Sequence, residues 1–307
     1  MKRKYILLAA LVVLTLVGTL ACQKSTGSNN NGQKSIVVTY PVLGSVVKEL
    51  VGDKATVNVS VPNGLDPHEW APSAKDIEAI NKADLVVQNG LGLEGGLEKT
   101  LKAARDRGVL FFTASDHITV RRVGSGEGIP SGNPDQVIGA EDPHLWTDPM
   151  AMKSIVSALA SQLKLGLGID VDTQSQDLQV RLENLNKEIS DQVTHLPLDN
   201  RNLVTGHESM GYFAQRYGFK LVGAIIPGIS TQAEVSAADL AALKKLIENN
   251  HVKAIFAELG TSTAVAKAIG NETGAKVVEL PTHSLPKDGS YFSFERNLAK
   301  IIIDALQ

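Results

Sequence analysis

Short apolar runs with β propensity alternate with helical patterns along most of this chain, and this alternation restricts the possible folds most strongly. Strands that alternate with helices predict parallel sheets with helices on both faces. The expected strands are Ile36–Tyr40, Ala55–Val61, Leu85–Gln88, Val109–Thr113, Leu203–Thr205, Leu221–Ile226, Ala254–Ala257 and Val277–Leu280. The expected helices lie near Gly44–Val51, Ala74–Lys82, Leu97–Arg107, Pro149–Leu163, Met210–Tyr217, Ala237–Asn249 and Ser262–Thr273.

One long amphipathic pattern interrupts the alternation. From about Thr173 to Val193, apolar residues recur three and four positions apart, which predicts a single helix. They are Leu178, Leu182, Leu185, Ile189 and Val193. The predicted fold class is therefore α/β, with two lobes of mostly parallel sheet flanked by helices and joined by one long helix. We expect the N-terminal lobe at 35–170, the linking helix at 171–197 and the C-terminal lobe at 198–307.

Local signals support several of these boundaries. Ser73 with Asp76 is typical of a capping box, and Asp148 places a cap residue before Pro149 at a first helical position. The segment Arg121–Gly139, rich in Gly, Ser and Pro, is expected to be a mobile surface loop.

The N-terminal segment has the pattern of an export signal. A basic start, Lys2 to Lys4, precedes an apolar run at Tyr5–Ala21 and then Cys22, the only cysteine. Polar residues from Gln23 to Gln33 indicate a flexible tether, so we expect a signal peptide at 1–21 and a tether at 22–34. Cys22 resembles the acylated cysteine of a bacterial lipoprotein. Thr19 stands where leucine is usual, and ordinary signal cleavage or an uncleaved anchor are the alternatives.

Composition excludes one class of partner. The chain carries 30 basic and 33 acidic residues, a formal net charge of −3, which gives no electrostatic reason to bind nucleic acid. With 307 residues, 43% of them hydrophobic, the chain can bury a substantial core. A monomer is expected.

Two similar pentapeptides carry the strongest functional signal. Asp66-Pro67-His68-Glu69-Trp70 and Asp142-Pro143-His144-Leu145-Trp146 contain the only two tryptophans of the chain. Each proline stiffens its loop, and each tryptophan ring can pin the loop to the protein while the imidazole stays free. Two such histidines suit a metal site that forms on folding, although a Trp-anchored turn with a locally bonded histidine is the plain alternative.

Two further histidines lie where an α/β protein binds ligands. His207 follows the strand Leu203–Thr205, and His283 follows Val277–Leu280, as His68 follows Ala55–Val61. Ligands bind beyond the carboxyl ends of parallel strands, so His68, His144, His207 and His283 together predict a tetrahedral site. The other three histidines, His117, His195 and His251, are better explained by loop and helix-end positions.

The chain resembles the metal-binding receptors of zinc and manganese ABC importers, the cluster A-I family. The resemblance spans about Ser35 to the C-terminus and depends on combined motifs. They are the two Asp-Pro-His motifs with Pro72-Ser73 and Asp148-Pro149, then Gly206-His207, Gly211-Tyr212-Phe213, Tyr217-Gly218, Glu234-Val235-Ser236 and Ala254-Ile255-Phe256-Ala257-Glu258. The family implies two lobes, a long rigid helix, one metal between the lobes, and no catalysis.

The resemblance also implies a ligand set. Its first three ligands fall on His68, His144 and His207, and its usual fourth, an aspartate, falls on His283. Because of that departure, the fourth ligand is His283, a water molecule, Glu208 or Glu279. We expect a solute-binding lipoprotein outside the cytoplasmic membrane, anchored through Cys22, that delivers its metal to an ABC permease.

Imidazole ligands favour Zn²⁺ over Mn²⁺, which prefers oxygen. The alternatives are a zinc-dependent hydrolase, with Glu69, Glu141 or Glu208 as base, and an Mn²⁺-specific receptor or an adhesin with a structural metal. No His-Glu-x-x-His motif supports the hydrolase.

Overall fold

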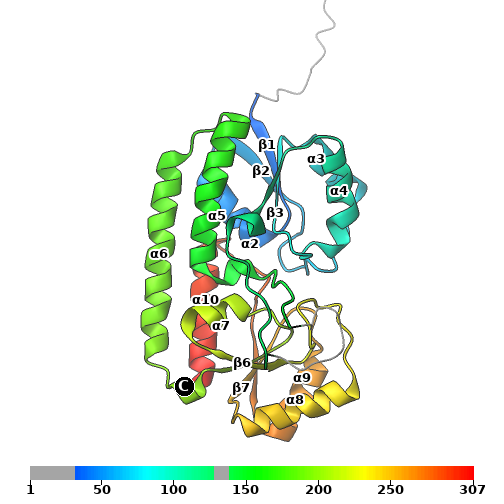
Figure 1. Ribbon diagram of the computed structural model, residues 1–307, viewed down its shortest axis with the longest axis vertical. Coiled ribbons are helices and arrows are strands. Elements are labelled where there is room, and N and C mark those ends of the chain that lie inside the picture. Colours follow the sequence, from blue (N-terminus) through cyan, green and yellow to red (C-terminus); the bar gives the residue numbers. More distant parts are fainter. Residues whose placement is uncertain (1–31, 128–137) are drawn as a thin grey trace, which may run out of the picture. The chain divides into compact units, whose positions relative to one another are not determined.

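The computed structural model describes residues 32–127 and 138–307, which contain two four-stranded parallel sheets with helices around them (Figure 1). The predicted α/β class is confirmed. The signal peptide, Cys22, nearly all of the tether and the middle of the loop Arg121–Gly139 lie outside the described residues. Within the described ranges, no helix is long and apolar enough to cross a membrane.

The first sheet has the strand order β2-β1-β3-β4. Its strands are β1 (Lys34–Val38), β2 (Ala55–Val59), β3 (Leu85–Gln88) and β4 (Phe111–Thr113). The helices between them are α2 (Pro41–Val51), α3 (Ala74–Lys82) and α4 (Glu98–Asp106). The predicted capping box forms, since the Ser73 hydroxyl accepts from the backbone of Asp76 at the start of α3. Because the strands are parallel, the loops after them emerge at the same edge.

The second sheet repeats this arrangement with the order β6-β5-β7-β8. Its strands are β5 (Asn202–Thr205), β6 (Lys220–Ala224), β7 (Ala254–Ala257) and β8 (Lys276–Glu279). Its helices are α7 (Gly211–Tyr217), α8 (Ala237–Asn249) and α9 (Thr263–Thr273). A small apolar cluster fills the space between this sheet and α8 and α9.

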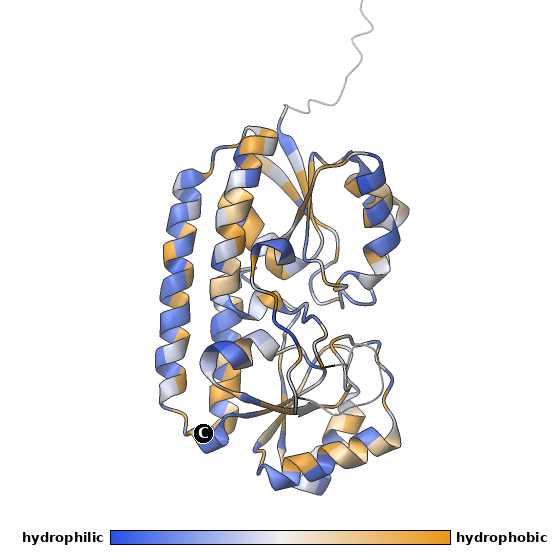
Figure 2. Cartoon of the chain, in the orientation of Figure 1, coloured by the Kyte–Doolittle hydropathy of each residue, from blue (hydrophilic) through white to orange (hydrophobic). Residues whose placement is uncertain are grey.

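Three longer helices complete the fold. They are α5 (Pro149–Gln162), α6 (Asp172–Thr194) and α10 (Tyr291–Leu306). The helix α6 packs against both α5 and α10 (Figure 1). Both α5 and α6 lie in the chain between the sheets, and α6 is the long helix that its apolar spacing predicted. The five predicted apolar residues of α6 are all buried, and Figure 2 shows the hydrophilic residues between them. One continuous core extends from the first sheet through these helices to Leu203 and Phe256 of the second.

The helix α10 was not predicted. It begins at Ser290, whose side chain accepts a hydrogen bond from the backbone nitrogen of Ser293. Ten of its residues are buried, and most of them recur three and four positions apart, so the sequence does carry a helical pattern here. Pro286 and Gly289 before it also belong to a turn rather than to a β/α unit.

Candidate metal centre

The four predicted histidines come together in one buried cluster. One nitrogen atom from each ring lies within 4.8 Å of the other three. Each of the four histidines is at most 3% exposed. His68 lies in the loop after β2 and His144 in the loop before α5. His207 lies between β5 and α7, and His283 between β8 and α10. Each sheet and its flanking loops therefore supply two imidazoles, as the three strand-end histidines and the repeated pentapeptide of His144 predicted.

The Nε2 atoms of three imidazoles point toward one another. Nε2 of His144 lies 3.4 Å from Nε2 of His68 and 3.1 Å from Nε2 of His207. A tetrahedral zinc ion with nitrogen ligands at about 2.0–2.1 Å would space its ligand atoms about 3.3–3.4 Å apart. The spacing of these nitrogen atoms therefore suits a tetrahedral metal without rearrangement of the loops.

Three of the imidazoles contact an oxygen through Nδ1, which leaves Nε2 free. Nδ1 of His144 lies 2.8 Å from Oδ1 of Asp142. Nδ1 of His207 lies 2.9 Å from Oε2 of Glu258. A carboxylate or hydroxyl at Nδ1 fixes the tautomer that exposes Nε2 to a metal.

His283 is oriented through a hydroxyl instead of a direct carboxylate. The Thr282 hydroxyl donates to Oε2 of Glu258 at 2.9 Å, so its oxygen can accept from Nδ1 of His283, 3.0 Å away. Nε2 of His283 is buried and has no partner within the described structure. An unpartnered buried nitrogen is costly, and a metal ion at the centre of the cluster would satisfy it. Glu258 thus serves both His207 and His283.

Burial makes most of these imidazoles neutral. The pKa of His68 and of His283 lies well below its ordinary value, because of burial first and of the neighbouring histidines second. Burial also lowers the pKa of His144 and outweighs the hydrogen bond that its Nδ1 donates to Asp142. Burial lowers the pKa of His207 as well, but the charge of Glu258 opposes it and leaves that pKa above its ordinary value. Neutral imidazoles are the form that binds metal.

Asp142 stays ionised behind His144. Burial raises the pKa of this carboxyl, but the hydrogen bond with His144 and the Arg121 guanidinium outweigh burial and leave it below the ordinary value. Nη1 of Arg121 donates to Oδ2 of Asp142 at 2.9 Å. The buried carboxylates of Asp142 and Glu258 therefore balance the charge of a divalent ion that four neutral ligands would leave uncompensated.

The two pentapeptides form the same turn. The backbone nitrogen of His68 donates to Oδ1 of Asp66, and that of His144 donates to Oδ1 of Asp142, both at 2.9 Å. Trp146 is fully buried, as expected for a ring that pins its loop. Trp70 is only half-buried, so the first loop is pinned less firmly than the second.

The remaining candidates lie outside the cluster. His117 is exposed and stacks on Phe112, with ring centroids 4.4 Å apart. His251 is exposed in the turn after α8, and Glu279 is exposed on β8. Glu208 does not belong to the metal-binding group of the described residues. Asp142, Glu258 and Thr282 were not predicted as supports of the imidazoles, although Asp142 and Glu258 lie inside motifs that carry the family resemblance.

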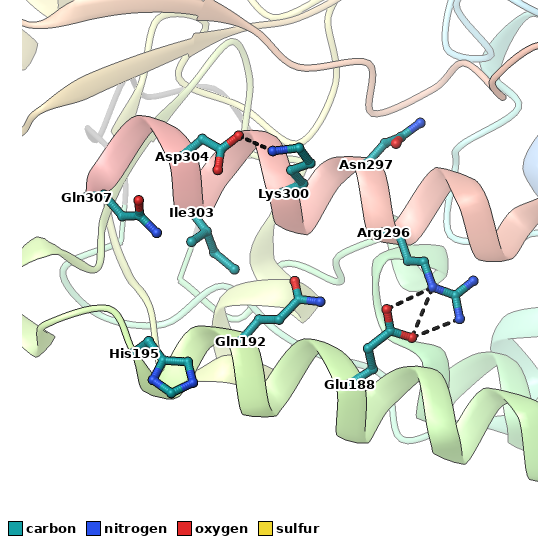
Figure 3. Close-up of a pocket in the computed structure, with 9 residues that line it drawn as sticks. All are labelled: Glu188, Gln192, His195, Arg296, Asn297, Lys300, Ile303, Asp304 and Gln307. Atoms are coloured by element: carbon teal, nitrogen blue, oxygen red, sulfur yellow. Dashed lines mark hydrogen bonds and ion pairs between the residues drawn. The ribbon is translucent and has the colours of Figure 1, made fainter.

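A groove lined by His195 lies away from the histidine cluster. It has a volume of about 460 Å³ and lies between α6 and α10, as Figure 3 shows. His195, which ends α6 as predicted, is its only histidine. The ion pair between Glu188 and Arg296 joins the two helices across the groove. The groove is therefore a gap between two packed helices, α6 and α10.

Known proteins share both the sequence pattern and the fold. A family model described as zinc-uptake complex component A, periplasmic, matches residues 36–305. The manganese ABC transporter substrate-binding lipoprotein PsaA of Streptococcus pneumoniae is 29% identical over 307 residues, 95% of this chain and 96% of PsaA. The high-affinity zinc uptake system protein ZnuA of Bacillus subtilis is 28% identical over 285 residues, 91% and 87% of the two chains. The solved structure of the periplasmic zinc binding protein TroA from Treponema pallidum matches with a TM-score of 0.77 and 26% identity, covering 90% of this chain and 99% of TroA.

Proposed function

The chain belongs to the zinc-uptake component A family of metal-binding receptors of ABC importers, and we propose that the metal it carries is Zn²⁺. Members of this family are solute-binding proteins and not enzymes. The site is a divalent metal site of four buried histidines. Relatives are named for manganese as well as for zinc, so the family alone does not decide between them.

The observation that carries the zinc proposal is the composition of the cluster. The side chains that converge are His68, His144, His207 and His283, and no carboxylate belongs to the group within the described residues. Mn²⁺ prefers oxygen ligands and lies lowest in the affinity order, whereas Zn²⁺ accepts four imidazoles in a tetrahedron. Cu²⁺ binds imidazole more tightly than Zn²⁺ does, so tetrahedral geometry and metal supply must exclude it.

In this proposal all four histidines are ligands through Nε2. His144 and His207 are the most firmly held, because the carboxyl groups of Asp142 and Glu258 contact their Nδ1 atoms. A fourth imidazole fills the position that a hydrolytic zinc keeps open for water, which also argues against a hydrolase.

The proposal extends to the rest of the chain. We propose that residues 1–21 are removed, that Cys22 is acylated, and that 22–34 tether a monomeric receptor outside the cytoplasmic membrane. The two sheets would form lobes at 35–170 and 198–307 with 171–197 between them, and the receptor would hand its metal to a permease. Relatives named as lipoproteins support the anchor. Replacing Cys22 by Ala should release the protein from membranes or leave the precursor unprocessed.

Metal competition tests the choice of zinc. The native protein, purified without added metal, should contain zinc by elemental analysis. When Zn²⁺ and Mn²⁺ are supplied together at equal concentration, the protein should take up zinc. Retention of manganese under these conditions would overturn the proposal for zinc and leave an Mn²⁺ receptor of the same fold.

A further inference from the structure

His68 differs from the other three imidazoles in how it is held. Among the described residues, no carboxylate or hydroxyl makes a hydrogen bond or ion pair with its Nδ1, whereas Asp142, Glu258 and Thr282 serve the other three rings. Only its backbone is fixed, by the bond from its nitrogen to Asp66 and by a bond to its carbonyl oxygen. The position of the His68 ring therefore depends on the position of its loop.

That loop is tied to the second-sheet side of the protein by two adjacent residues. The Thr231 hydroxyl donates to Oδ2 of Asp66 at 2.6 Å, and Nε2 of Gln232 donates to the carbonyl oxygen of His68 at 3.3 Å. Thr231 is 8% exposed, so water competes little for its hydroxyl. Asp66 uses its other oxygen for the turn that presents His68. One carboxylate thus connects the ligand loop with Thr231.

The backbone of Gly260 allows this contact. Gly260 has a φ of 82°, and a Cβ atom there would lie 3.0 Å from Cγ2 of Thr231 and 3.2 Å from Oδ2 of Asp66. A side chain at this position would press on both partners of the hydrogen bond. The close approach shows that the loop of Gly260 packs against both Thr231 and Asp66, which are also joined by their hydrogen bond.

The outer side of the His68 loop faces a surface hollow of about 310 Å³. Asp66 and Glu69, on either side of His68, border the hollow together with Leu259 and Gly260. The His68 loop therefore separates the buried cluster from solvent on this side. Movement of this one loop would both remove a ligand and expose the metal.

We propose that Thr231 is a positioning residue that holds the His68 loop over the bound metal and sets the rate at which the metal leaves. Gln232 supports the same loop through the weaker second bond. The inference deepens the proposed function and rests on it, since it concerns release from the same site. It assigns no new ligand.

The test compares Thr231→Val with Thr231→Ser. Valine keeps the shape and removes the hydroxyl, whereas serine keeps the hydroxyl. Zinc-loaded protein is mixed with an excess of a chromophoric chelator, and the dissociation rate is read from its absorbance. Thr231→Val loses the hydrogen bond to the Asp66 carboxylate, so zinc should leave this variant about tenfold faster than the wild type. Thr231→Ser should release zinc at the rate of the wild type. The metal-free protein should stay folded in both variants, with a lower melting temperature only in Thr231→Val, which loses the hydrogen bond to Asp66.

The outcomes separate this inference from the proposed function. A wild-type protein that holds no zinc contradicts the proposed function. If the wild type holds zinc, an unchanged rate in Thr231→Val, or the same acceleration in Thr231→Ser, overturns only the role of Thr231. If Thr231→Val does not fold, Gln232→Ala decides. It should speed release about threefold, and an unchanged rate there also overturns the proposal.

Discussion

The indole nitrogen of Trp146 donates a hydrogen bond to the carbonyl oxygen of Thr282 at 2.9 Å. The tryptophan that follows His144 therefore also holds the loop that presents His283. The Trp146 ring packs beside both imidazoles, with centroids 5.3 Å from that of His144 and 5.2 Å from that of His283. One fully buried side chain thus connects a histidine from each side of the cluster.

Replacing Trp146 by Phe should weaken zinc binding about tenfold. Phenylalanine keeps a large ring but leaves the buried carbonyl of Thr282 without its donor, at a cost of about 1–3 kcal/mol. Competition with a chelator of known affinity measures the change. Trp70→Phe is the matched control, because Trp70 is only half-buried and should be nearly silent. Equal losses in both variants would argue against a special role for Trp146.

Replacing Glu258 by Gln should weaken zinc binding about 10–100-fold, the usual effect of losing a group that orients metal ligands. Glutamine removes the charge beside Nδ1 of His207 and disturbs the acceptor of the Thr282 hydroxyl. Glu279→Gln, at an exposed glutamate, is the control and should bind as the wild type does. Calorimetry on both variants gives the comparison, and wild-type affinity in Glu258→Gln would remove Glu258 from the site.

Zinc affinity should fall as the pH drops, in two stages. Protons compete with zinc for the imidazoles, and His207 takes a proton first because its pKa is raised. Below that pKa, affinity should fall by about one power of ten per pH unit. The other three have lowered pKa values, so the slope should steepen only at lower pH. A series of titrations from about pH 8 to 5 measures the slope, and a flat profile would contradict a histidine site.

Much of this structure could be predicted from local sequence. The strands β3 and β7 and the helices α3 and α8 have the predicted bounds, because short apolar runs and caps mark them. The four histidines could be found because each one follows a strand or lies inside the repeated pentapeptide. Predictions were weaker where long-range packing decides. Glu258 supports the site only because folding brings β7 beside His207 and Thr282. The helix α10 was also missed, although most of its buried residues recur three and four positions apart.

Replacing His283 by Asp should keep zinc and tighten Mn²⁺ binding about tenfold. A carboxylate supplies the hard oxygen that Mn²⁺ prefers and lowers the charge of the occupied site. His283→Asn is the matched control, since it has the same shape without the charge. Titrations with both metals compare the variants. If Mn²⁺ binds no more tightly to the Asp variant than to the Asn variant, the lack of a carboxylate at position 283 does not set the preference.

A crystal structure of the zinc-loaded protein tests the central claim most directly. We predict one zinc ion held by Nε2 of His68, His144, His207 and His283, with each nitrogen about 2.0–2.1 Å from the metal. The ring of His283 is the decisive observation, because the other three agree with the ligand pattern of the family. If that ring turns away from zinc and a water molecule or Glu208 completes the shell, the four-histidine site is wrong.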